Sequence, residues 1–390
     1  MPPFSSRLRW DLPRNRLTLL AEERRRRGAE VLDLTESNPT RVGLPYPAAD
    51  ILAALSDPRT LTYEPSPRGL PEARAAVAER LSRLGVAADP ERLLLTASTS
   101  EAYAFLFNLL LDPGEEVLVP HPSYPLLDLL ASLESVRLRP YALAYEGRWS
   151  LDLDSLRRAT TAATRAVVVV HPNNPTGCFL RREEADGLRA WCRERGLAII
   201  SDEVFRDYAL APDVNRLPTL AGVEDVLTFC LDGLSKSAGL PQMKLGWIWL
   251  AGPPGLRREA LERLELVADS FLSVGSPVQH AARRLLHIGD RMRGLILERL
   301  RANLDLLRAA VARAPSCTLL EPEGGWTAVL RLPATRSDED WALELLREEG
   351  VRVHPGYFYD FTQEAVLILS LLPEPGIFHE GVARVMARAS

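Results

Sequence analysis

Two residues stand out in this 390-residue sequence, because they are the only lysines among its 47 basic side chains. Lys236 and Lys244 lie eight residues apart in the stretch DGLSKSAGLPQMKLGW. A guanidinium stays protonated in proteins, whereas a desolvated lysine amine can lose its proton and then act as a nucleophile or form a Schiff base. The plain alternative is that an arginine-rich sequence kept two surface lysines by accident. Their surroundings favour the chemical interpretation.

Polar or small residues follow five apolar runs that we predict to be strands. Val, Ile and Leu fill these runs almost continuously, as in parallel strands buried on both faces. The runs are RLLLT (92–96), EVLVP (116–120), RAVVVV (165–170), LAIIS (197–201) and VLTFCL (226–231), followed by ASTSEA, HPSYP, HPNNPTG, DEVF and DGLSK. Ligands bind at the carboxyl ends of strands in open α/β sheets. Hydroxyls, an aromatic ring, an amide, a carboxylate and an amine are therefore expected to meet in one crevice.

The elements around these motifs predict two domains. Helical patterns alternate with the strands, which indicates βα units in a large domain over residues 42–285. From about residue 286 the pattern changes to a long arginine-rich helix, followed by WTAVLRLP, DEDWALELLREEG, VRVHP and AVLILSLL. These read as strand, helix and two more strands. We expect residues 1–41 and 286–390 to form a smaller α+β domain.

Composition excludes several classes of function. The net charge of −5 predicts no nucleic-acid partner, and the sequence has neither a long apolar span nor an apolar leader, which favours the cytoplasm over a membrane or export. Four cysteines without a CxxC pair indicate buried thiols in a reducing compartment. No metal site is expected.

Taken in order, these motifs resemble the class I/II aminotransferases, which are fold-type I pyridoxal phosphate-dependent enzymes. The resemblance spans about Val31 to Ser370. It implies a mostly parallel sheet flanked by helices, and a transfer of an amino group between an amino acid or amine and a 2-oxo acid or aldehyde. By this resemblance Lys236 forms an aldimine with pyridoxal 5'-phosphate and then moves the substrate proton. Asp202 pairs with the pyridine nitrogen, although alone it would also suit a helix N-cap.

The resemblance assigns the other cofactor contacts. Tyr124 stacks on the ring and Asn174 binds its hydroxyl, although locally these are also consistent with a core tyrosine and a turn. Ser98, Thr99 and Ser100 form the phosphate-binding turn, Ser98 with Glu101 also reading as a capping box. The remaining contacts are Ser235, Phe205 and Lys244, the last of which replaces an arginine on the phosphate.

Tyr63 extends the predicted site to a second subunit. It begins YEPSPRGLPEAR (63–74), which matches a segment whose tyrosine reaches the phosphate of the neighbouring subunit. The resemblance therefore implies a homodimer with shared sites. A tyrosine that merely packs in a loop is the alternative.

Two departures from the family pattern leave the substrate open. Phe205 stands where a tyrosine usually donates to the ring oxygen, so we expect an aldimine pKa above the usual family range. Ile368 stands where an arginine usually clamps the substrate carboxylate. Ser37, Asn38 and Arg41, in and after DLTESNPT (33–40), are the candidate substrate contacts. The alternatives are a lyase or decarboxylase on the same scaffold, and a non-enzymatic regulator, which the absence of a DNA-binding extension disfavours.

Overall fold

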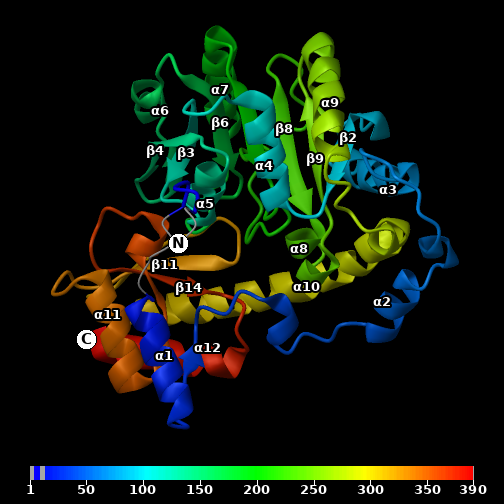
Figure 1. Cartoon of the computed structure of the whole chain (residues 1–390). Helices are drawn as coiled ribbons and strands as arrows, with labels where there is room; N and C mark the ends of the chain where they lie inside the picture. The colour runs from blue at the N-terminus through cyan, green and yellow to red at the C-terminus, as the bar shows by residue number, and fades with distance from the viewer. Residues whose placement is uncertain (1–3, 9–13, 390) are drawn as a thin grey trace.

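The larger sheet forms the upper part of the molecule in Figure 1. The structure is a computed structural model that describes residues 4–8 and 14–389. Within these residues the sheet has eight strands in the order β2-β9-β8-β7-β6-β3-β4-β5, of which only β9 and β5 run against the others. Its strands are β2 (Leu93–Thr96), β3 (Glu116–His121), β4 (Arg137–Tyr145), β5 (Trp149–Leu151), β6 (Thr164–Val170), β7 (Ala198–Asp202), β8 (Thr228–Gly233) and β9 (Gly246–Ala251).

Helices cover both faces of this sheet, because its central strands are apolar on both faces. In β7, Ile199 packs into one apolar cluster while Ala198 and Ile200 pack into another on the opposite face. One cluster includes α4 (Thr99–Leu110), α5 (Leu126–Leu133) and α9 (Pro254–Asp269), and the other includes α2 (Ala48–Leu55), α3 (Pro71–Ser82), α6 (Leu153–Ala159) and α7 (Arg182–Arg195). The predicted α/β architecture is confirmed.

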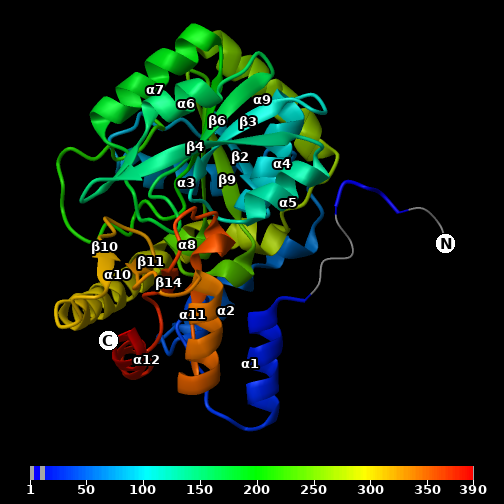
Figure 2. The same cartoon turned by 90° about the vertical axis from the view of Figure 1, so that its left-hand side faces the viewer.

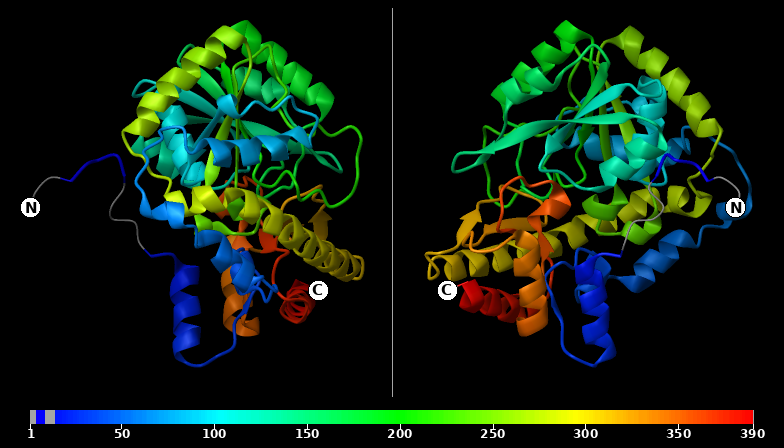
Figure 3. Two further views of the ribbon diagram at one scale, coloured as in Figure 1. Left: turned by 90° about the vertical axis from the view of Figure 1, so that its right-hand side faces the viewer. Right: turned by 60° about the vertical axis from the view of Figure 1, so that its left-hand side comes forward.

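A smaller antiparallel sheet lies below the first in Figures 1 and 2. Its order is β10-β11-β14-β13, and a separate parallel pair joins β1 to β12. These strands are β1 (Leu32–Asp33), β10 (Thr318–Leu320), β11 (Thr327–Arg331), β12 (Val351–Arg352), β13 (His354–Pro355) and β14 (Val366–Ser370). Helices α1 (Arg16–Arg26), α11 (Asp338–Glu344) and α12 (Pro375–Ala389) pack around them, with α1 beside α11 (Figure 3).

One long helix connects the two sheets. Helix α10 (Ser276–Val311) packs Leu285 with the large sheet and Leu304 with the small one. It runs across the predicted boundary between residues 285 and 286, so the division into 42–285 and the two terminal segments stays a prediction. No helix in the described part of the chain has the length and apolarity needed to cross a bilayer.

Candidate active site

A cavity of about 400 Å³ lies where the carboxyl ends of the large-sheet strands face the small sheet. Most of the predicted site residues line it: Ser37, Ser98, Thr99, Ser100, Tyr124, Asn174, Asp202, Phe205, Ser235, Lys236 and Lys244. Strands β2, β3, β6, β7 and β8 run in the same direction, so the residues that follow them meet at one edge of the sheet. Asn38, Arg41 and Tyr63 are not among the residues that line this cavity.

Lys236 lines this cavity and is half-buried there. It lies on the short helix α8 (Leu234–Ser237), which follows β8 directly, and its backbone oxygen accepts a hydrogen bond of 2.6 Å from Tyr208 Oη. Its Nζ is 4.6 Å from the ring centroid of Trp326 and 5.4 Å from that of Phe205. Burial lowers the pKa of Lys236 to about 8, and the negative charge of Asp202 opposes that shift. The amine is therefore much easier to deprotonate than an exposed lysine.

Asp202 ends β7, the strand that pairs with β8. Its Oδ1 accepts a hydrogen bond of 3.2 Å from the Val204 N–H, and its Oδ2 accepts one of 3.0 Å from Tyr103 Oη. Burial raises the pKa of Asp202 to about 6, while both hydrogen bonds favour the ionised form. With a pKa of about 6, Asp202 is mostly ionised at neutral pH, and a cationic partner beside it would favour the ionised form further.

A buried ion network fixes the ends of these two strands. Arg206 donates to Glu203 Oε2 at 2.8 Å and to Asp232 Oδ2 at 3.2 Å. Glu203 directly follows Asp202, and Asp232 stands four residues before Lys236. Because one guanidinium holds both acids, it positions the strand ends that carry the carboxylate and the amine.

The start of α4 forms the hydroxyl-rich part of the cavity. Ser98 caps the helix by accepting from the Glu101 N–H at 3.2 Å, as predicted. In a capping box the Glu101 carboxylate would accept from the backbone N–H of Ser98 itself. Here it accepts from the Ala97 N–H, one residue earlier, at 2.7 Å, so only the Ser98 half of the predicted capping box is present. Thr99 and Ser100 face the cavity at a helix N-terminus, where backbone N–H groups and the helix dipole favour an anion. Lys244 is exposed at the same cavity.

Asn174 contributes a side-chain amide to the cavity. Its Oδ1 is buried, yet it makes no hydrogen bond within the described part of the chain. A buried polar atom without a partner costs free energy, and a ligand that occupies the cavity can supply the missing hydrogen bond. Tyr124 lies at the same cavity with about half of its side chain exposed.

The sequence analysis missed several residues that line the cavity. Among them are Tyr103 on α4, Leu126, Leu127 and Leu130 on α5, and Trp326, Thr327, His354 and Tyr359 in or beside the small sheet. Tyr103 stands one helical turn after Thr99, so the spacing along α4 could have revealed it. The small-sheet residues carry no comparable signal, because nothing local to them indicates which surface they face.

Comparisons with known proteins agree with this geometry. The sequence model of the family described as "Aminotransferase class I and II" matches residues 29–368. The chain belongs to this family. This aminotransferase is 27% identical to the glutamate-pyruvate aminotransferase AlaA of Haemophilus influenzae, over 92% of this chain and 90% of that protein. It is 29% identical to the alanine aminotransferase of Mycobacterium tuberculosis, over 89% of this chain and 82% of that one.

Solved structures give the same result. The alanine aminotransferase from Pyrococcus furiosus superposes with a TM-score of 0.88 at 25% identity, covering 96% of this chain and 95% of the other. The aspartate aminotransferase of Thermotoga maritima has the same fold, with a TM-score of 0.84 at 22% identity and 99% coverage of both chains. The predicted amino-group transfer is confirmed for this aminotransferase, and these relatives are aminotransferases rather than lyases or decarboxylases.

Proposed function

We propose that this aminotransferase works with pyridoxal 5'-phosphate, and that the cavity at the end of the large sheet holds it. The observation that carries the proposal is that one cavity holds both an amine and a carboxylate, the half-buried side chains of Lys236 and Asp202. The unpaired Oδ1 of Asn174 supports the fit, because a ring hydroxyl could satisfy it. When bound, the cofactor would supply an electron sink for the electron pair left as the substrate Cα loses its proton.

Each residue then has a defined task. Lys236 anchors the cofactor and carries the proton away from the substrate Cα. Asp202 keeps a proton on the ring nitrogen, and Tyr103 keeps Asp202 ionised through its hydrogen bond. Asn174 and Tyr124 orient the ring and exclude water from its faces. Ser98, Thr99, Ser100, Ser235 and Lys244 bind the phosphate.

The chain offers an internal control for testing this proposal. Borohydride reduction of the cofactor-loaded protein should attach the label to Lys236 and leave Lys244, the other lysine, unlabelled. Peptide mapping by mass spectrometry reads the result. A panel of amino compounds should then convert the bound chromophore, which separates transamination from elimination. A protein that stays colourless with added cofactor, or a label at Lys244, would contradict the proposal.

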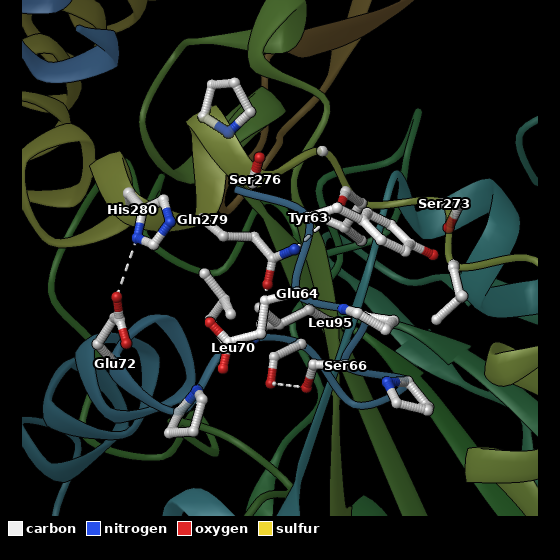
Figure 4. Close-up of a pocket in the computed structure, with 18 of the residues that line it drawn as sticks. Tyr63, Glu64, Ser66, Leu70, Glu72, Leu95, Ser273, Ser276, Gln279 and His280 are labelled. Atoms are coloured by element: carbon white, nitrogen blue, oxygen red, sulfur yellow. Dashed lines mark hydrogen bonds and ion pairs between the residues drawn. The ribbon is translucent and has the colours of Figure 1, made fainter. Parts of the chain in front are cut away.

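We also infer a homodimer in which Tyr63 completes the neighbouring site. Tyr63 is 80% exposed at a second hollow of about 700 Å³ (Figure 4). Leu61, which ends the 3-10 helix Pro58–Leu61, is 90% exposed, and Phe271, in the segment after α9, is 65% exposed. A second copy would remove these apolar side chains from water. Leu95 lines this hollow and Ser98, three residues later, lines the cavity, so a partner residue in the hollow is close to the predicted phosphate turn.

Mixed dimers test this inference. Lys236→Ala and Tyr63→Ala are each expected to be nearly inactive alone, but mixing them should restore roughly a quarter of the activity, because one site per mixed dimer has both residues. Lys236→Ala mixed with Asp202→Ala is the control, since both changes lie in the same subunit's cavity. Mixed dimers that form without recovery would place Tyr63 outside the site.

The names of the relatives suggest substrates, but one residue of this cavity differs from the family pattern. Their names point to alanine, glutamate and pyruvate. Ile368 lines this cavity where the family resemblance predicted an arginine, so we propose only that the substrates are an amino compound and a carbonyl acceptor. Four free, buried cysteines support our expectation of a reducing, cytoplasmic location.

A further inference from the structure

The small-sheet wall of the cavity consists of Trp326, Thr327, His354, Tyr359, Ile368 and Ser370, and in the described part of the chain it includes no lysine or arginine that could bind a carboxylate. Among the described residues that line the cavity, the lysines are Lys236 and Lys244, and none is an arginine. We have assigned Lys236 to the cofactor and Lys244 to its phosphate. A substrate carboxylate held against this wall would therefore lose its hydration without gaining an ion pair, which is costly.

Ile368 gives this wall a fixed apolar surface. It is 1% exposed and pairs in register with Val329 on one side and His354 on the other. Its side chain belongs to an apolar cluster with Trp149 and Tyr359. Because neighbouring strands fix Ile368 on both sides, a ligand bound at this wall contacts its aliphatic side chain. Leu126, Leu127 and Leu130 of α5 also line the cavity.

His354 contributes the imidazole of this wall, and it is uncharged near neutral pH. Burial lowers the pKa of His354 to about 4; the charge of Arg352 lowers it further and that of Asp33 opposes the shift. Its Nδ1 is 3.1 Å from Tyr359 Oη, so the pair forms a neutral hydrogen-bonding unit. Such a unit suits a neutral polar group better than an anion.

Trp326 supplies a donor that the protein leaves unused. Its side chain is 2% exposed, and its Nε1–H has no partner within the described residues. The neighbouring hydroxyls are already satisfied, since Thr327 donates to Pro175 O at 2.8 Å and Ser370 donates to Glu36 O at 2.7 Å. A buried donor without an acceptor costs free energy, which a bound acceptor would recover.

We propose that the amino substrate of this enzyme is an apolar amino compound that presents a neutral group, not a carboxylate, to Ile368, Trp326 and His354. Amino-acid amides, amino alcohols and primary amines belong to this class. The Trp326 indole donates to the neutral acceptor where one is present, and the leucines of α5 contact the apolar part. This inference rests on the proposed transamination.

The decisive experiment compares three amino donors that share the side chain of leucine. Cofactor-loaded enzyme is mixed with L-leucine, L-leucinamide or 3-methylbutylamine, and conversion of the chromophore is followed in single turnovers. We expect leucinamide or the amine to react at least about tenfold faster than leucine at low donor concentration. If leucine reacts fastest, the inference is wrong, whether the carboxylate is bound by this chain or by a partner.

A binding measurement separates this inference from the proposed function. If none of the donors converts the chromophore, transamination itself fails. Calorimetric titration with 4-methylpentanamide and 4-methylpentanoate then decides the inference, since neither needs to react. Tighter binding of the amide supports it, and tighter binding of the acid overturns it.

Substitutions assign the effect to residues. Ile368→Arg should shift the preference toward leucine by at least about tenfold, because it supplies the missing cation, while Ile368→Leu should keep the preference for neutral donors. Trp326→Phe should slow leucinamide more than 3-methylbutylamine, because only the amide brings an acceptor. Equal losses for both donors would remove Trp326 from recognition.

Discussion

The hydroxyl of Tyr103 donates a hydrogen bond of 3.0 Å to Oδ2 of Asp202. Tyr103 lies on α4, the helix whose first residues, Thr99 and Ser100, face the cavity as predicted phosphate contacts. The same helix therefore reaches both the phosphate end of the site and the carboxylate at the end of β7. One rigid element sets the spacing between them.

Removing this hydroxyl should shift the pH dependence of the reaction. Its hydrogen bond favours the ionised carboxylate, so Tyr103→Phe should raise the pKa of Asp202 and move the acid limb of kcat/KM to higher pH by about one unit. Tyr141→Phe is the matched control, because Tyr141 is also buried and donates to Val168 O at 2.8 Å outside the cavity. An unchanged acid limb would show that Tyr103 is structural.

Capture of the cofactor by the cofactor-free protein should depend on pH through Lys236. Only the neutral amine attacks an aldehyde, so the rate of colour formation should rise with pH around a midpoint near the pKa of about 8. Asp202→Asn removes the negative charge that raises this pKa, so the midpoint should move to lower pH. Stopped-flow absorbance measures both, and a midpoint that moves upward would contradict the assignment.

Adding a hydroxyl at position 205 should change the absorbance spectrum of the bound chromophore. Phe205 packs edge-on against Trp326, with ring centroids 5.4 Å apart, beside the amine of Lys236. Phe205→Tyr should lower the pH at which the bound chromophore loses its proton by about one unit, because a donor at the ring oxygen stabilises the deprotonated form. Phe205→Leu serves as the control that adds no hydroxyl. Absorbance titration that finds the same value in all three proteins would refute this expectation.

The buried guanidinium of Arg206 should be important for stability. Arg206→Met leaves the buried acids Glu203 and Asp232 without their partner and should cost about 3–5 kcal/mol of unfolding free energy. Urea denaturation followed by circular dichroism measures the loss. The exposed Arg26 in α1 provides a control, since Arg26→Met should change stability by no more than about 0.5 kcal/mol. Equal effects of the two changes would argue against the network.

Local sequence patterns predicted the central strands of the large sheet, but they missed its edge strands β4 and β5 and parts of the C-terminal helices. The apolar runs at 92–96, 116–120, 165–170 and 197–201 all became strands, because strands buried on both faces need continuous apolar sequence. Strands β4 and β5 gave no such signal, since β4 lies near the sheet edge and is mostly half-buried or exposed. Helix α12 was also not predicted, and the predicted helix at 338–350 ends its α-helical part at Glu344 before a π-helical turn.

The sequence by itself determined which chemical groups gather at the end of the large sheet. Residues that follow parallel strands must lie at one edge, so Lys236, Asp202 and Asn174 could be placed together from their strands alone. Only the tertiary structure decided which side chains lie across the cavity from these three residues. Trp326, His354 and Ile368 reach the cavity because α10 packs the small sheet against the large one, and such contacts between distant segments leave no local pattern along the chain.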